Sequence, residues 1–139
     1  MEIKFKKMNK IVFIIIVLAS GWAACKKNTP VDGNGLLITT RRECSVSSFE
    51  LQGTDFVSVR VGTAVIDTTA QTIKVTVQFG TDLKNLYPQF TLTQDCILDP
   101  KVTGLTDFSD LANPRKWTVV SGDRKIKKTY SVIITVQPR

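Results

Sequence analysis

The chain has 139 residues, of which 42% are apolar and 22% charged, with a formal net charge of +7, three cysteines and no histidine. This length allows one domain. The absence of histidine excludes most enzymes that use a histidine general base, histidine-based zinc sites and histidine pH switches. We therefore predict a protein that is not an enzyme, without catalytic residues, metal or cofactor.

The first 24 residues have the pattern of an export signal. Residues 1–10 contain four lysines and one glutamate, and an apolar run of nine residues follows at 11–19. A membrane-spanning helix needs roughly 20 apolar residues, so a signal peptide over 1–24 is favoured. Without this segment the net charge falls to +4. There is no dense arginine cluster, which argues against a nucleic-acid partner.

The segment around Cys25 distinguishes two export routes. Trp22 stands where ordinary signal peptidase requires a small residue, whereas Ala23-Ala24-Cys25 resembles a bacterial lipobox. We therefore expect Cys25 to carry a lipid that anchors the protein to a membrane. The alternative is a free cysteine after an uncleaved anchor. Residues 25–41 are rich in Gly, Pro, Asn and Asp at their centre, which predicts a lipidated N-terminus on a flexible tether.

Apolar and polar residues alternate over 72–79, which predicts a half-buried strand. Two further alternating runs, within 117–136, flank Ser121-Gly122-Asp123 and predict a β-hairpin. Val120 and Ile133 on its second face are also apolar, which indicates either that parts of both faces are covered or that the strand lies in the middle of a sheet. Weaker strands are expected over 44–51, 62–66, 89–93 and 95–98, and a short helical turn over 81–86.

About seven short strands at intervals of roughly ten residues are typical of a β-sandwich. The predicted fold class is therefore all-β, an antiparallel sandwich of about seven strands with one short helical turn. The predicted domain covers residues 42–139.

Several segments in order carry a resemblance to a known family. They include Thr106-Asp107-Phe108-Ser109, Trp117-Thr118-Val119 and Lys128-Thr129-Tyr130-Ser131-Val132. From Cys44 to Gln137 the chain resembles the immunoglobulin-like domains of Bacteroides-type envelope lipoproteins, which occur in glycan-utilisation and carbohydrate-metabolism lipoproteins. The resemblance implies an immunoglobulin-like sandwich in the cell envelope.

The resemblance also bears on location. Surface-exported lipoproteins of that group carry acidic residues after the lipidated cysteine, whereas here Lys26-Lys27-Asn28 follows. We expect the periplasmic side of the outer membrane first and the cell surface second.

The other two cysteines, Cys44 and Cys96, form an even pair in an exported and oxidising compartment. A disulfide between them would close a loop of 53 residues. The alternative, two thiols that never meet, stays open at this point. Neither cysteine has a histidine to activate it as a nucleophile.

Two aspartate pairs, Asp95 with Asp99 and Asp107 with Asp110, resemble the carboxylates of a glycosidase or a calcium site. Neither pair lies in a dense ligand run, and both flank residues common in turns. We therefore expect these side chains to cap turns.

Exposed aromatic rings are the usual means by which a β-sandwich binds sugars. The strand phases place five rings inward: Phe49, Phe79, Phe90, Trp117 and Tyr130. Phe56, Tyr87 and Phe108 remain as candidate ligand-binding rings, against the alternative that they pack in the core or in turns.

The sequence thus predicts a lipid-anchored, non-catalytic binding module of the envelope, an accessory protein linked to glycan utilisation. Its partners would be the membrane through Cys25 and a polysaccharide or an envelope protein. The alternative is a structural or spacer lipoprotein that binds another envelope protein and has no glycan ligand.

Overall fold

The computed structural model describes residues 29–139. The predicted signal peptide and the lipidation of Cys25 lie outside the described residues. Within 29–139 the structure has no helix with the length and apolar character needed to cross a membrane.

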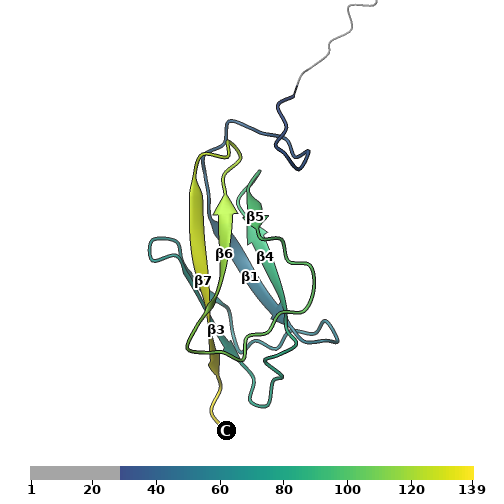
Figure 1. Cartoon of the computed structure of the whole chain (residues 1–139). Coiled ribbons are helices and arrows are strands. Elements are labelled where there is room, and N and C mark those ends of the chain that lie inside the picture. The colour runs from purple at the N-terminus through teal and green to yellow at the C-terminus, as the bar shows by residue number, and fades with distance from the viewer. Residues whose placement is uncertain (1–28) are drawn as a thin grey trace, which may run out of the picture.

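In the described part of the chain seven strands form two sheets, so the all-β sandwich is confirmed (Figure 1). The smaller sheet pairs β1 with β4, and the larger sheet has the order β2-β3-β7-β6-β5. The described N-terminal segment lies at one end of the molecule and the C-terminus at the other. The strands are β1 (Val46–Gln52), β2 (Val65–Asp67), β3 (Thr72–Val77), β4 (Tyr87–Leu92), β5 (Ile97–Asp99), β6 (Arg115–Val120) and β7 (Lys127–Val136).

One strand pair corrects the expectation of a wholly antiparallel sandwich. β3 and β7 are parallel, in register from Thr72 opposite Ser131 to Val77 opposite Val136. Parallel strands need a long crossover, and here the chain passes through β4, β5 and β6 before β7 enters between β3 and β6. The predicted hairpin is confirmed as β6 and β7. Because β7 has a partner strand on both sides, it lies inside the sheet, which is one of the two alternatives that its apolar faces indicated.

The core lies between the sheets and is built from the inward faces of their strands. An aromatic stack joins the two sheets, with Phe90 of β4 at 4.9 Å from Phe49 and 5.1 Å from Trp117 between ring centroids. Pairs at this spacing add roughly 0.5–1.5 kcal/mol beyond their burial. The side chains exposed by less than 2% include Phe49, Leu51, Ile73, Val75, Val77, Val119, Tyr130 and Val132.

The segment between β3 and β4 differs from its prediction. Residues 81–86 contain a turn at Leu83 and Lys84 and no helix. The Leu83 carbonyl accepts the Phe108 N–H at 2.7 Å and the Leu86 N–H donates to the Thr106 carbonyl at 3.2 Å, so these groups bond across to residues 106–108 and not along a helix. The expectation that Phe79 is a core residue is wrong. β3 ends at Val77, and Phe79 is 59% exposed with the Arg139 guanidinium 5.9 Å from its ring centre.

The described part of the predicted tether, residues 30–41, makes contacts with the domain. A turn brings Val31 opposite Leu37. Arg124 then donates hydrogen bonds to the Asp32 carboxylate and to the Leu37 carbonyl, each at 3.0 Å. The Thr39 backbone N–H also donates to the carbonyl of Gly122 in the hairpin turn at 2.9 Å. These contacts offset the entropy of the Gly- and Asn-rich segment.

Candidate functional site

Two of the three predicted ligand-binding rings lie together in the structure. Gln52 at the end of β1 pairs with Tyr87 at the start of β4, so the loop after β1 lies beside Tyr87. The rings of Phe56 and Tyr87 meet edge to face, with centroids 5.8 Å apart. Phe56 is 64% exposed and Tyr87 is half-buried. The pair therefore presents aromatic surface to solvent.

The loop that carries Phe56 is fixed by its own hydrogen bonds. The Gly53 N–H donates to the Val57 carbonyl at 2.9 Å, and the Asp55 carboxylate accepts the Val57 N–H at 3.1 Å. Phe56 itself has φ of 60°, in the left-handed region that a phenylalanine rarely adopts. Such backbone strain persists only where the surroundings impose it, and it clusters at functional sites.

An ion pair closes the base of this loop. Arg60 Nε donates to Glu50 Oε1 at 2.7 Å, and a second guanidinium nitrogen donates to Oε2. The Ser58 hydroxyl also donates to Glu50, at 2.8 Å. These hydrogen bonds, the one from Arg60 above all, lower the pKa of Glu50 to about 2. Phe56 is thus held in place before any ligand arrives, which reduces the entropy cost of binding.

A groove runs along β4, with Tyr87 in its lining. Its volume is about 360 Å³, within the range of small-ligand sites. One wall is β4 of the smaller sheet, and the other is formed by β5 of the larger sheet and the residues just after it. Its lining consists of apolar and neutral polar side chains: Tyr87, Pro88, Gln89, Phe90, Thr91, Leu98 and Val102. Sequence reasoning missed the groove because its walls come from segments that only the sandwich brings together.

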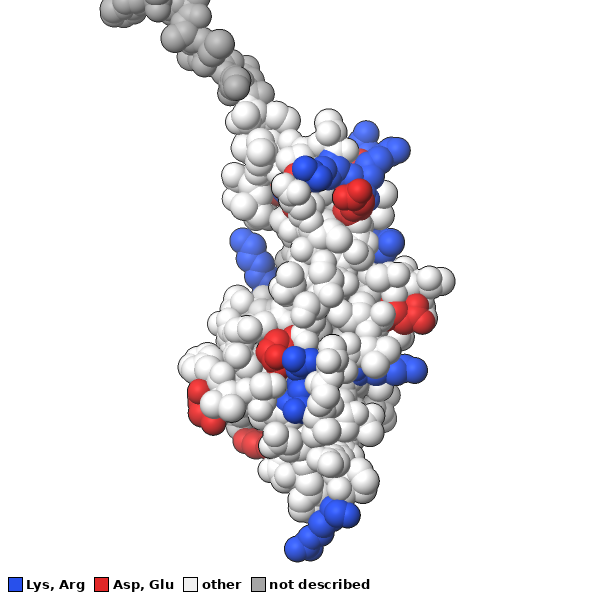
Figure 2. Space-filling view, turned by 180° about the vertical axis from the view of Figure 1, so that it is seen from behind, with Lys and Arg blue, Asp and Glu red and all other residues white. Residues whose placement is uncertain are grey.

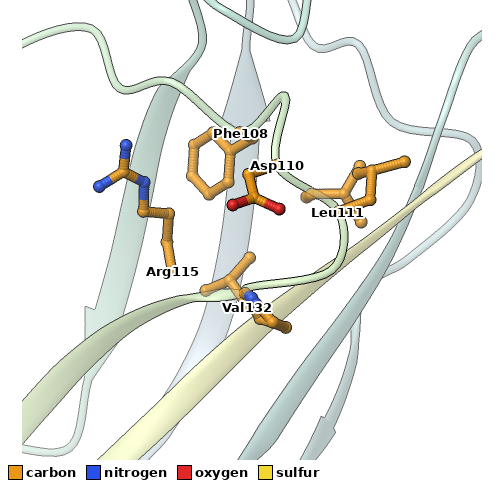
Figure 3. A pocket seen from close by; sticks show the side chains of 7 residues that line it. Phe108, Asp110, Leu111, Arg115 and Val132 are labelled. Carbon is orange, nitrogen blue, oxygen red and sulfur yellow. The ribbon is translucent and has the colours of Figure 1, made fainter.

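Phe108 does not join this site. It is 3% exposed, and its ring centroid lies 5.9 Å from that of Trp117. It also lines a small pocket with Asp110, Leu111 and Arg115 (Figure 3). That pocket measures about 10 Å³, which is room for at most one water molecule. The ring of Phe108 is a core contact and offers no face to a ligand.

The aspartate pairs serve local structure. Asp107 accepts the Ser109 backbone N–H at 2.8 Å, and Asp110 accepts the Asn113 side-chain amide at 2.9 Å. These hydrogen bonds lower the pKa of both carboxyls, the opposite of the raised pKa of a general acid. Asp95 pairs with Arg41 at 3.1 Å, and Asp99 is exposed at the end of β5. Within residues 29–139 no cluster of three metal-ligating side chains is present.

Cys44 and Cys96 are free thiols, the first buried and the second half-buried.

On the face seen in Figure 2, basic and acidic side chains are interspersed, and a basic group adjoins an acidic one near the grey segment. Neither sign of charge dominates this face, so it does not resemble a surface built for a polyanion.

The comparisons with known proteins place the domain in a family. Residues 46–134 match the model of the family described as "SGBP, N-terminal". A search of curated proteins finds no match.

Three solved structures match this chain, and the first two below share its fold. A protein of Bacteroides thetaiotaomicron described as "a putative glycoside hydrolase" is 30% identical, with a TM-score of 0.58 over 70% of this chain and 26% of its own. A DUF4623 family protein of Bacteroides eggerthii is 16% identical, with a TM-score of 0.51 over 70% of this chain and 22% of its own. A protein of Bacteroides fragilis described as "a putative secreted protein" has 13% identity and a TM-score of 0.49, over 69% of this chain and 97% of its own.

This chain thus spans about a quarter of the first two relatives. The family match covers most of the described sandwich, including both partners of the aromatic pair. The chain therefore belongs to the SGBP N-terminal family, a domain family of glycan utilisation in Bacteroides.

Proposed function

We propose that this protein is a lipid-anchored, non-catalytic, immunoglobulin-like module that binds a neutral glycan at the Phe56–Tyr87 pair and along the adjoining groove. It would act as an accessory protein of glycan utilisation at the outer membrane, on the periplasmic side. The observation that carries the proposal is the exposed, pre-positioned aromatic pair beside an uncharged groove, in a domain of the SGBP N-terminal family.

The chemistry of the site suits a sugar chain. The C–H faces of a pyranose ring are apolar, so they can pack against aromatic rings such as Phe56 and Tyr87. The exposed side chains of Gln89 and Thr91 supply hydrogen-bond donors and acceptors for hydroxyl groups. The lining carries no ionisable side chain other than the Tyr87 phenol, which favours a neutral glycan over a uronic acid or sulfated one.

The state of the carboxylates supports a protein that binds a glycan and does not cleave it. Asp107 and Asp110 are engaged in turns, with a lowered pKa. The glycoside hydrolase description belongs to a protein of which this chain matches 26%, and its activity is not carried over.

The test is affinity electrophoresis of the mature chain, with Cys25→Ser to avoid lipid, through gels containing neutral polysaccharides. We expect one of them to retard the protein, and we expect Phe56→Ala and Tyr87→Ala each to weaken binding about tenfold, equivalent to roughly 1.4 kcal/mol. Phe79→Ala is the matched control, because Phe79 is similarly exposed but belongs neither to the Phe56–Tyr87 pair nor to the groove lining. Migration that no glycan changes, or equal retardation of all four proteins, would refute the proposal.

A second candidate is a spacer that positions an envelope protein and has no glycan ligand. It is favoured by the small share, 26% and 22%, that this domain takes of two relatives' chains. It predicts that cross-linking in native membranes captures one defined envelope protein with wild type and with Phe56→Ala alike.

A further inference from the structure

The two cysteines that the sequence left unassigned lie at the same end of the sandwich. Cys44 stands just before β1 of the smaller sheet, and Cys96 just before β5 at the edge of the larger sheet. The Cys96 thiol donates to the Glu43 carbonyl at 3.0 Å. That carbonyl belongs to the peptide bond between Glu43 and Cys44, so the Cys96 sulfur lies against the backbone of Cys44.

The Cys44 side chain points toward the same region. Its thiol donates to the Val119 carbonyl at 3.0 Å. Val119 lies in β6 next to Val120, and Val120 pairs with Ile97, the residue after Cys96. Burial raises the pKa of Cys44, and the nearby Cys96 thiol raises it further. Both thiols therefore lie at the junction of the two sheets, Cys44 on the Val119 carbonyl and Cys96 on the carbonyl that precedes Cys44.

We propose that Cys44 and Cys96 form a disulfide in the exported protein and so link the two sheets at the end where the N-terminal segment packs. The thiols are free in the structure described here. The disulfide requires the two side chains to turn away from their carbonyl acceptors, Val119 and Glu43.

The bond forms by exchange with an external disulfide of the thiol–disulfide oxidant class. The half-buried Cys96, as thiolate, attacks one sulfur of the oxidant, forms a mixed disulfide and releases the first oxidant thiol. The buried Cys44 then loses its proton and displaces the second thiol. Two cysteine thiols are oxidised, one external disulfide is reduced to two thiols, and the two protons from the cysteines end on those thiols. Cys96 reacts first because Cys44 is only 4% exposed and an external oxidant cannot reach it.

The cross-link would close the chain from Cys44 to Cys96, which contains β1 to β4. Loop closure of this length restricts the unfolded chain, and we expect the oxidised form to melt about 10–20 °C above the reduced form. In the cell, the disulfide depends on the proposed export, because export would bring the protein into contact with an oxidant. The chemistry can be tested on purified protein.

The experiment uses the mature chain carrying Cys25→Ser, incubated with oxidised glutathione and then denatured. We expect the intact mass to fall by two hydrogens and iodoacetamide to label no cysteine, whereas dithiothreitol should restore two labelled sites. Cys96→Ser should melt like the reduced wild type in both conditions. Because Cys96 is half-buried, this variant keeps the test valid if Cys44→Ser fails to fold.

Two labelled cysteines after oxidation, or only glutathione adducts and intermolecular dimers, would overturn the inference. Glycan retardation measured on the same samples separates the two proposals. If a glycan retards the protein but no intramolecular disulfide forms, only the disulfide proposal is refuted. If the disulfide forms but no glycan retards the protein, only the glycan-binding proposal is refuted.

Discussion

Glu50 is the residue whose replacement best tests how the loop carrying Phe56 is held. Its carboxylate accepts hydrogen bonds from the Arg60 guanidinium and from the Ser58 hydroxyl, and it also accepts the Leu51 N–H at 2.9 Å. The Glu50 side chain is 28% exposed and that of Arg60 19%. Glu50→Gln keeps the size of the side chain and removes its charge, so it isolates the ionic part of these contacts.

The magnitude follows from the pKa of Glu50, which falls from 4.5 to about 2 on folding. A shift of this size corresponds to about 3 kcal/mol, and partial exposure reduces the expected effect to about 1–2 kcal/mol. Because the pKa is lower in the folded state, the stabilisation is complete above pH 4.5. It is lost as the pH falls from 4.5 toward 2.

The assay is urea unfolding of wild type and Glu50→Gln at pH 7 and at pH 3. We expect the variant to be less stable by about 1–2 kcal/mol at pH 7, and we expect more than half of that difference to disappear at pH 3. Arg42→Gln is the control. Arg42 is 71% exposed in its pair with Asp123, so its loss should cost less than about 0.5 kcal/mol. A difference that is the same at both pH values would refute the electrostatic reasoning.

Two further predictions concern the hairpin and the core. In Gly122→Ala the added Cβ would collide with Thr39 Oγ1 and would lie 3.2 Å from the Arg41 carbonyl, so thermal melting should show a loss of about 1–3 kcal/mol. Gly33→Ala, which has open space around it, should stay within about 0.5 kcal/mol, and equal melting of the two variants would contradict the docking of residues 30–41. The buried Tyr130 hydroxyl lies near the Val46 backbone but makes no hydrogen bond of good geometry, so Tyr130→Phe should be neutral or stabilise by up to about 1 kcal/mol. Urea unfolding that shows a loss above about 1 kcal/mol would reveal a partner for this hydroxyl.

Local patterns predicted much of the fold. The alternation over 72–77 appears as β3 with Ile73, Val75 and Val77 inward, and the hairpin around Gly122 appears as β6 and β7. Both elements depend on side-chain period and turn chemistry, which are properties of neighbouring residues. The family was also recognisable from short motifs of the β6–β7 region, and the family match covers them.

Local patterns failed where an element's role depends on a distant partner. The alternation that placed Phe79 inward continues past Val77, but β3 ends where its partner β7 ends at Val136. The strand phases did not place Phe108, so it stayed a candidate ligand-binding ring with packing in the core or in a turn as the alternative. The structure shows it packed against Trp117. An alternating pattern of apolar and polar residues shows neither where strand pairing ends nor which part of the protein packs over a loop.

The candidate site shows the same division. The sequence by itself determined that Phe56 and Tyr87 fall outside the inward strand phases, that Cys44 and Cys96 are an even pair, and that strands alternate around Gly- and Asp-rich turns. Only the tertiary structure decided that Phe56 meets Tyr87, that Cys96 lies against the backbone of Cys44, and that β3 and β7 run parallel. The physical reason is that strand pairing joins residues tens of positions apart, and the order of pairing is set by the packing of two whole sheets.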